Sequence, residues 1–395
     1  MNCRKVVSAV FLLLVSVCMQ AQGTCVIEGK VKNVKQGVCL NLFRMEGDVG
    51  NSIATDTLQG DSFRFEIPIS KTDTERLSLM IRDGNLYSMG LSLWAKEGSH
   101  IRLTGEDMNI YTWQVESEMP QQKIWQLFVN DSRDLWNHNQ ENRMEHMRLM
   151  RKYPRKPDDK EVLAKVVALR DSLERSEEKV ENDLDIRIDS NVIARMKQLP
   201  IEEVWMDKLK SLAIGVRYTK GYPYRKEVEE LYARLTDEQR KTPEALDIRA
   251  YLFPAQTVAT QEQAADGDLF DLQGNVHRLS DFKGKAVLID FWSRGCGPCL
   301  KALPEMKEIS QKYKDRLEVV SISIDDKTNW EIASRHHAIS WWNLNDLKGN
   351  HGLYAKYSAG SIPRYVFLSP EGEVVEMWSG YGKGSLLEKL GKLME

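Results

Sequence analysis

The sequence predicts a multidomain protein in which a C-terminal α/β domain follows an antiparallel β-sandwich-like domain and an α-helical spacer. Its length of 395 residues is enough for two or three domains. Apolar residues change from a strand-like to a helical period along the chain, and strand and helix patterns then alternate towards the end. A formal charge of −3 gives no electrostatic case for a nucleic-acid partner or an anionic membrane.

Residues 1–21 have the pattern of a signal peptide. A short basic stretch precedes an apolar run over 6–17, which is too short to span a bilayer. We therefore expect an exported, periplasmic protein whose compartment permits disulfides. Plain cleavage after Ala21 and lipid attachment at Cys18 are both open, and a membrane association is expected only through such an anchor.

Residues 25–115 have the pattern of a β-rich domain. Short stretches with alternating apolar residues, such as 39–43 and 63–67, are separated by glycine-containing turns. Short strands at this spacing are typical of an antiparallel sandwich. Cys25 and Cys39 lie in two of the stretches. A disulfide between them and two unpaired thiols are both open, because the sequence does not give the geometry of the pair.

Residues 119–252 change to a helical period, with Trp125 and Phe128 among the apolar residues near the start. Prolines divide the region into separate helices, namely Pro154, Pro157, Pro200 and Pro243. The density of Glu, Lys and Arg predicts solvated helix faces. The small and polar residues over 255–267 predict a linker.

From residue 268 to 395 the pattern alternates between strands and helices. The stretch 285–292 is almost continuously apolar, as expected of a strand that is buried on both faces, and 317–324 is a second such stretch. The remaining expected elements are a helix over 299–312, a hairpin over 364–378 and a terminal helix over 385–394.

Two cysteines, Cys296 and Cys299, enclose Gly297 and Pro298 where the first buried strand gives way to a helix. Unpaired N–H groups and the helix dipole stabilise a thiolate at such a position, so Cys296 is predicted to be reactive. Pro298 suits the first helical turn because it has no N–H. Half a zinc site and an inert disulfide are the alternatives, but zinc needs four ligands. The sequence therefore predicts a redox dithiol that needs no metal or other cofactor.

With these motifs, residues 268–393 resemble the thioredoxin-like domain of exported disulfide reductases of the TlpA/ResA type. The matching stretches are 269–274, 279–285, 287–292, the Cys-Gly-Pro-Cys motif and 361–363. The regions before this domain resemble, by pattern and order, the β-rich N-terminal domain and helical spacer of such reductases in Bacteroides-type bacteria.

The resemblance implies roles for further residues. Asp290 would be the acid–base group that takes the proton of Cys299, and burial should raise its pKa towards neutrality. A buried carboxylate with a purely structural role is the alternative. Pro363 would be a cis-proline beside the cysteines, which leaves the backbone of Ile362 to pair with a substrate strand. The implied partners are protein disulfide substrates and an upstream dithiol electron donor.

Some positions depart from the family pattern. Gly295 stands where the family usually has Trp, and Arg364 where it commonly has Thr. Loss of the ring should expose Cys296 and remove an apolar platform for the substrate. Arg294 is a cation that could stabilise the thiolate instead; a solvated arginine is the alternative.

The leading functional hypothesis is an exported thiol–disulfide oxidoreductase that reduces protein disulfides, in which Cys296 attacks and Cys299 resolves the mixed disulfide. A thiol peroxidase is one alternative, since Ser293 lies three residues before Cys296, although Ile289 replaces the proline that a peroxidase motif requires. A non-enzymatic interaction module of the same fold is the other alternative, and the intact Cys-Gly-Pro-Cys motif disfavours it.

Overall fold

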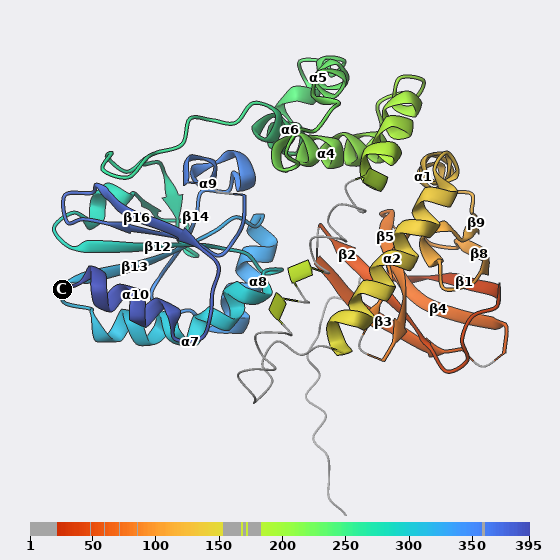
Figure 1. Cartoon of the computed structure of the whole chain (residues 1–395), viewed down its shortest axis with the longest axis horizontal. Coiled ribbons are helices and arrows are strands. Elements are labelled where there is room, and N and C mark those ends of the chain that lie inside the picture. The colour runs from red at the N-terminus through yellow and green to blue at the C-terminus, as the bar shows by residue number, and fades with distance from the viewer. Residues whose placement is uncertain are drawn as a thin grey trace, which may run out of the picture. The chain divides into compact units, whose positions relative to one another are not determined.

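The computed structural model describes residues 22–395 apart from 48, 59, 71, 85, 153–166, 169–170, 173–182 and 358–359. The signal-peptide stretch 1–21 with Cys18, and the predicted helix breakers Pro154 and Pro157, therefore lie outside the described residues. The chain divides into two compact units, Met1–Arg170 and Asp171–Glu395 (Figure 1). Within the described ranges, no helix has the length and apolar character needed to cross a membrane.

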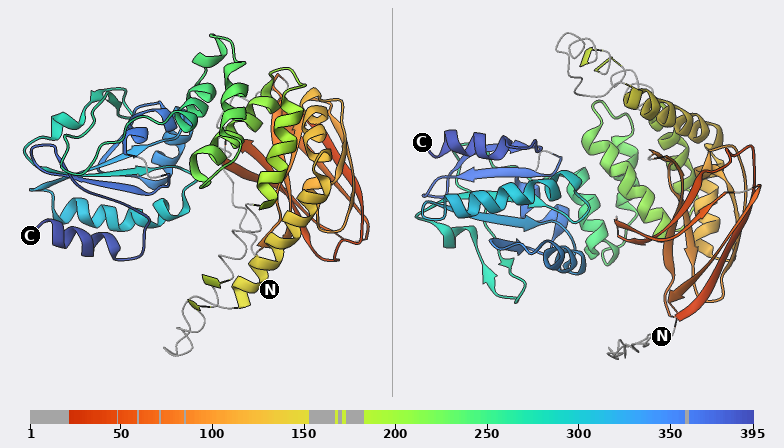
Figure 2. Two further views of the ribbon diagram at one scale, coloured as in Figure 1. Left: turned by 45° about the horizontal axis from the view of Figure 1, so that its top comes forward. Right: turned by 90° about the horizontal axis from the view of Figure 1, so that it is seen from below.

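The first unit contains two β-sheets, seen as the red and orange strands in Figures 1 and 2. Its strands are β1 (Gln22–Lys32), β2 (Cys39–Glu46), β3 (Val49–Thr57), β4 (Ser62–Ser70), β5 (Glu75–Asp83), β6 (Leu86–Tyr87), β7 (Leu91–Ala95), β8 (His100–Glu106) and β9 (Gln114–Glu116). One sheet has the order β4-β1-β8-β9 and the other β3-β2-β5-β6, with β7 also paired to β5. Only β1 and β8 pair in parallel among these strands, because the many residues between them provide the long connection that parallel pairing needs.

Side-chain alternation determines which face of each sheet is buried. Along β4 every second residue from Phe63 to Ile69 is buried, while the residues between them are exposed. Leu40 and Leu42 are fully buried in the same way on β2 of the other sheet. The β-rich N-terminal region that the sequence predicts is therefore present, with one parallel strand pair in addition to the antiparallel ones.

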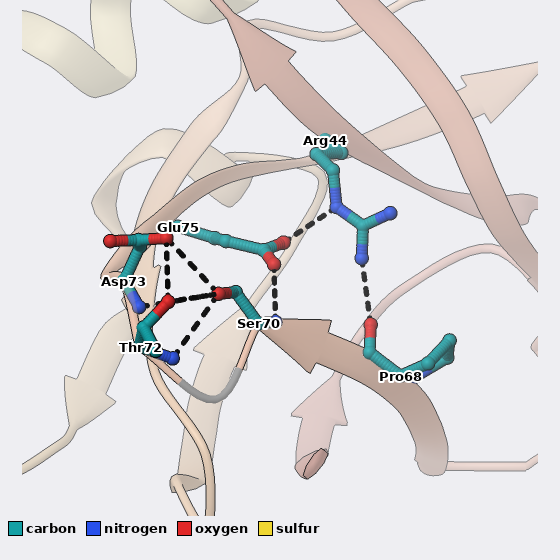
Figure 3. A network of polar contacts seen from close by, with 6 residues as sticks. All are labelled: Arg44, Pro68, Ser70, Thr72, Asp73 and Glu75. Atoms are coloured by element: carbon teal, nitrogen blue, oxygen red, sulfur yellow. Dashed lines mark hydrogen bonds and ion pairs between the residues drawn. The ribbon is translucent and has the colours of Figure 1, made fainter. Parts of the chain in front are cut away.

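Arg44 connects the two sheets (Figure 3). From β2, its Nε donates a hydrogen bond to Oε2 of Glu75 on β5 at 2.5 Å. Its Nη2 donates to the carbonyl oxygen of Pro68, on β4 of the other sheet, at 2.7 Å. The remaining carboxylate oxygen of Glu75 accepts the backbone N–H of Ser70 at 2.6 Å. One half-buried guanidinium therefore bonds both sheets at the connection from β4 to β5.

Cys25 and Cys39 are free thiols. Cys25 is buried on β1, and burial raises the pKa of its thiol to about 11. Cys39 begins β2 in the other sheet, where its sulfur lies 3.6 Å from the hydroxyl of Thr57. Of the two possibilities that the sequence left open, the structure has the unpaired thiols.

In the described part of the first unit, η1 (Ile110–Thr112) lies between β8 and β9, and α1 (Pro120–Asn130) and α2 (Arg133–Lys152) follow the strands. Trp125 and Phe128 of α1 are buried, as their helical spacing predicts. The amide of Gln122 donates to the carbonyl of Ser92 at 3.1 Å and accepts the N–H of Trp94 at 3.3 Å. These bonds fix α1 beside β7.

The second unit begins with helices. A helical stretch over 183–196 is followed by α4 (Glu203–Tyr218), α5 (Arg225–Ala233), η2 (Gln239–Lys241) and α6 (Pro243–Leu252). Pro243 is the first residue of α6, where its missing N–H is not needed, and the hydroxyl of Thr242 caps the helix by accepting the N–H of Ala245 at 3.3 Å. The buried indole of Trp205 donates to the carbonyl of Met196 at 3.0 Å and so joins α4 to the preceding helix.

A seven-stranded sheet forms the centre of the α/β part, in the order β11-β10-β14-β13-β12-β15-β16. Its elements are β10 (Leu269–Phe270), β11 (Val276–His277), η3 (Leu279–Phe282), β12 (Ala286–Trp292), α7 (Gly297–Lys312), β13 (Leu317–Ser323), α8 (Lys327–His337), β14 (Trp342–Asn345), η4 (Gly349–His351), α9 (Leu353–Tyr357), β15 (Arg364–Leu368), β16 (Val374–Ser379) and α10 (Ser385–Leu393). Strands β12, β13 and β14 are parallel, whereas β15 and β16 are the predicted antiparallel hairpin.

Helices cover both faces of this sheet (Figure 2). On one face, Met306 of α7 and Leu386 of α10 pack in the same cluster as Leu288 of β12. On the other face, Phe291 of β12 packs with Tyr357 of α9. Every residue of β12 is buried, as the continuous apolar pattern predicts.

The segment 255–267, which the sequence predicts to be a linker, is bound to the α/β part. The N–H of Val258 donates to the carbonyl of Lys356 at 2.9 Å, and that of Ala264 to the carbonyl of Gly372 at 2.9 Å. Its composition of small and polar residues is that of a linker, but its backbone groups form hydrogen bonds with the α/β part.

Candidate active site

The two motif cysteines lie between β12 and the first turn of α7. They form a disulfide, with 5.3 Å between their Cα atoms. Cys296 is the N-cap of α7, and its sulfur accepts the N–H of Cys299 at 3.2 Å. In the dithiol form, this N–H and the helix dipole favour a thiolate on Cys296. Cys296 is 8% exposed and Cys299 only 2%, so Cys296 is the more accessible residue of the pair.

Apolar side chains surround the disulfide on its inner side. Trp292 at the end of β12 and Trp330 of α8 belong to the same buried cluster as the cysteines, and Ile362 packs against it. The loop side is different, since Gly295 and Gly297 are exposed and carry no side chain. The two glycines leave the loop beside Cys296 without side-chain cover, and the approach of a substrate from this side stays a prediction.

The loop before Cys296 is held from the start of α8. The N–H of Arg294 donates to Oδ2 of Asp325 at 2.7 Å, and its guanidinium donates to Oδ1 of Asn329 at 2.6 Å. Asp325 also accepts the hydroxyl of Ser323 at 3.0 Å, and burial raises its pKa. The Arg294 side chain is thus tied to α8, and its effect on the thiolate stays a prediction. Asp325 and Asn329 were not singled out from the sequence. The only signal in the sequence is that Asp325 is an aspartate directly after a buried strand.

Asp290 lies on the face of β12 that α7 covers. Because side chains alternate along a strand, Asp290 shares this face with Leu288 and Trp292. Cys299 begins the buried stripe of α7, which continues one turn later with Ala302. The carboxyl group and the inner cysteine therefore face the same interface between strand and helix.

The surroundings of Asp290 are almost completely apolar. Its side chain is 2% exposed, and Oδ2 accepts the hydroxyl of Ser321 at 3.1 Å, while Ser321 accepts the indole N–H of Trp341 at 2.8 Å. Oδ1 of Asp290 has no hydrogen-bond partner among the described residues. The same holds for the hydroxyl of Tyr365, the residue of β15 that lies opposite Asp290 in the sheet. Burial, partly offset by the Ser321 hydroxyl, raises the pKa of Asp290 to about 7.

The peptide bond between Ile362 and Pro363 is cis. The side chain of Ile362 contacts the disulfide cluster, whereas its backbone N–H and C=O make no hydrogen bond to any part of the chain that the structure describes. The side chain of Arg364 turns back into the protein, since its Nε donates to the carbonyl of Tyr357 at 2.9 Å. The structure thus brings the cis bond and the cysteines together, and a substrate role for Ile362 and Pro363 stays a prediction.

Comparisons with known proteins match the same part of the chain. A family model described as thioredoxin-like matches residues 284–374. The thiol-disulfide oxidoreductase ResA of Geobacillus kaustophilus is 30% identical over 125 residues, which are 31% of this chain and 71% of that protein. The thioredoxin-like protein YneN of Bacillus subtilis is 31% identical over 120 residues, 30% of this chain and 71% of that protein.

Solved structures are similar to the same region. The thioredoxin domain of a thiol-disulfide oxidoreductase from Bacteroides vulgatus has 28% sequence identity and a TM-score of 0.33, and the match covers 35% of this chain and 100% of that chain. A thiol-disulfide oxidoreductase from Bacteroides fragilis has 27% identity and a TM-score of 0.31, with 33% of this chain and 99% of that chain covered.

Proposed function

Because the chain belongs to the thioredoxin-like thiol-disulfide oxidoreductases, we propose that it reduces protein disulfides with Cys296 and Cys299. The fold of the C-terminal domain is the one that the sequence predicts. The observation that carries the proposal is the Cys296–Cys299 disulfide at the N-terminus of α7, where the sulfur of Cys296 accepts the N–H of Cys299. The same N–H can stabilise a thiolate in the dithiol form.

The first step is attack on the substrate. The thiolate of Cys296 forms a bond to one sulfur of the substrate disulfide, and the substrate S–S bond breaks. One substrate cysteine leaves as a thiolate, and the other remains joined to Cys296 as a mixed disulfide. The greater exposure of Cys296 supports its assignment as the attacking residue.

The second step releases the product. Cys299 transfers its thiol proton to Asp290, attacks the sulfur of Cys296 and displaces the second substrate thiolate. The substrate has then gained two electrons, and the enzyme has the Cys296–Cys299 disulfide. A carboxyl whose pKa is about 7 can accept this proton and return it to solvent near neutral pH. A dithiol donor must supply two electrons to restore the reduced enzyme.

Ile362 would hold the substrate during both steps. Its backbone N–H and C=O are unbonded among the described residues, so they can pair with an extended substrate segment beside the disulfide. The signal-peptide pattern of residues 1–21 supports an exported, periplasmic enzyme, with a lipid anchor at Cys18 as the alternative to plain cleavage.

Trapping of the mixed disulfide tests the proposal. The Cys299→Ser variant should accumulate protein partners that are joined to Cys296 and released by a reducing agent, because resolution is blocked. The Cys296→Ser variant should trap none and should not reduce a model protein disulfide. Full activity in Cys296→Ser would rule out this nucleophile, and consumption of hydrogen peroxide faster than disulfide exchange would support the peroxidase instead.

A further inference from the structure

The helices before the α/β part touch the loop that carries Ile362. Tyr218, the last residue of α4, lies directly against Gly360, because a Cβ placed on Gly360 would be only 2.4 Å from Cε1 of the tyrosine. Gly360 also has a φ of +88°, so a larger residue is disfavoured there on both counts. Ile362, two residues further on, packs against the disulfide cluster. An aromatic side chain of the helical region therefore stands next to the candidate active site.

A second contact fixes this arrangement. Nδ1 of His351 lies 2.8 Å from Oδ1 of Asp247 on α6, and these side chains are only 21% and 20% exposed. The cavity that remains between α4, α6 and α9 has a volume of about 20 Å³, which is room for little more than one water molecule. Helices α4 and α6 are therefore packed closely against η4 and α9, the elements that precede the loop, and this packing holds the end of α4 that carries Tyr218.

Tyr218 nevertheless remains open to solvent. It is 46% exposed, although Tyr251 of α6 meets its ring edge-on with 6.0 Å between the ring centroids. The guanidinium of Arg217 lies 5.8 Å from the centroid of the same ring. A tyrosine held by such neighbours presents a large apolar surface and loses little conformational entropy on binding, which is why tyrosines are common in binding sites.

The loop on the other side of Cys296 offers no comparable surface. Gly295 is exposed and has no side chain, and the guanidinium of Arg294 is bonded to Asn329. The apolar contact for a polypeptide that approaches Cys296 is thus available on the side of Gly360, where Tyr218 lies.

We propose that Tyr218, supported by Tyr251, is a specificity-determining residue that contacts the substrate polypeptide next to its disulfide and favours an apolar side chain beside the cysteine. This inference rests on the proposed function. The substrate is an extended segment, since the unbonded backbone of Ile362 pairs only with a segment whose own backbone is free. A segment that pairs with Ile362 and continues past Gly360 reaches the exposed ring. Small disulfides lack such a flanking segment.

Steady-state kinetics of the full chain test the proposal with three substrates: a peptide disulfide with leucine next to each cysteine, the same peptide with serine instead, and glutathione disulfide. We expect Tyr218→Ala to raise KM for the leucine peptide about tenfold at unchanged kcat, with little effect on the other two. Tyr218→Phe keeps the ring and should behave as the wild type. The matched control is Tyr87→Ala, which removes a 40% exposed tyrosine from the first unit and should change nothing.

Two results would overturn the inference. One is an equal KM of Tyr218→Ala and the wild type for the leucine peptide. The other is an equal loss on all three substrates, which would mean that Tyr218 only positions the loop. Both leave the proposed function intact. If the wild type itself reduces none of the three substrates, the proposed function fails, and its extension fails with it.

Discussion

At the scale of single residues, Asp290 has to satisfy two opposing requirements. Burial among Leu288, Trp292 and the strands on either side favours the neutral carboxyl, whereas proton transfer requires the carboxylate. The hydroxyl of Ser321 is the hydrogen-bond donor that stabilises the charged form. With a pKa of about 7, both forms are populated near neutral pH, which is the condition for a proton acceptor that must also be regenerated.

The Asp290→Asn variant should spare the first attack and slow the resolution step. Cys296 is activated by its place at the start of α7, whereas Cys299 is 2% exposed and must lose a proton where burial disfavours the thiolate. A carboxylate can take that proton and a carboxamide cannot. We expect resolution at pH 7 to be slower by about 100-fold, the lower end of the range for a general base, and the mixed disulfide to accumulate. Stopped-flow measurement across pH should show the defect shrinking as hydroxide takes over.

Ser321→Ala is the informative control for this variant. It keeps the carboxyl group but removes the hydrogen bond that lowers the pKa of Asp290, so the pH at which resolution becomes fast should move upward. Wild-type resolution rates at pH 7 in Asp290→Asn would reduce Asp290 to a structural carboxyl and leave Cys299 without an identified base.

Asp290 should also make stability depend on pH. An ordinary aspartate has a pKa of 3.8, whereas the pKa of Asp290 in the folded protein is about 7. Between these pH values the unfolded chain loses the proton and the folded protein keeps it. The free energy of unfolding therefore falls as pH rises through this window. The loss is complete above pH 7 and amounts to about 4 kcal/mol. Urea unfolding of the oxidised protein should therefore find Asp290→Asn more stable than the wild type at pH 8, with the difference largely gone at pH 4. A difference that is the same at both pH values would contradict this assignment.

The residues of the site differ in how far the sequence could identify them. Cys296 and Cys299 are evident because a short local motif defines both, whereas the role of Asp290 is implied by the resemblance to the family. Asp325 and Asn329 are different, since their contacts with Arg294 join the loop after β12 to the loop after β13 and the first turn of α8. Such contacts depend on tertiary packing, which no local pattern records.

At the scale of elements, the long apolar segments were predictable and the short ones were not. The expected strand over 285–292 is β12 and the expected helix over 299–312 is α7, which begins two residues earlier because Gly297 and Pro298 form its first turn. Strand β14 has four residues, two of them asparagines, and escapes a pattern based on alternation. Most residues of helix α8 are polar, so its apolar residues, among them the buried Trp330, show only a weak helical period. Residues 342–345 form a strand because they pair with β13, and the sequence of these four residues alone does not predict that pairing.

Arg44 provides a test of how the two sheets of the first unit are joined. Arg44→Met keeps much of the aliphatic volume but removes the bonds to Glu75 and to the carbonyl of Pro68. Because Glu75 would remain half-buried without its cation, we expect the free energy of unfolding to fall by about 2 kcal/mol. Urea denaturation measures the change. Arg64→Met is a matched control, since it removes an exposed ion pair with Glu28 and should cost clearly less than Arg44→Met. Equal losses in the two variants would mean that Arg44 does not join the sheets.

At the scale of the whole molecule, the spacer predicted over 119–252 supplies helices to both compact units. Helices α1 and α2 belong to the first unit, while α4, α5 and α6 belong to the second, where the pair of Asp247 and His351 joins α6 to the α/β part. Composition and periodicity could identify a helical region but not its division, because the contacts that divide it involve residues far apart in sequence.

The segment 255–267 allows the autonomy of the C-terminal domain to be tested. A fragment of residues 255–395 should fold and retain the Cys296–Cys299 chemistry, since the seven-stranded sheet and both of its covering helix layers lie within it. A fragment of residues 268–395 loses the backbone bonds from Val258 and Ala264, and it uncovers part of the apolar cluster that Val258 packs against. The segment makes four backbone hydrogen bonds to the domain in all, so we expect the shorter fragment to be less stable by about 5 kcal/mol, from these bonds at about 1 kcal/mol each and the lost apolar contact. Urea denaturation and reduction of glutathione disulfide by each fragment provide the measurement. Equal stability of the two fragments would mean that residues 255–267 are only a linker. If the longer fragment does not fold, the helices α4 to α6 are part of the domain.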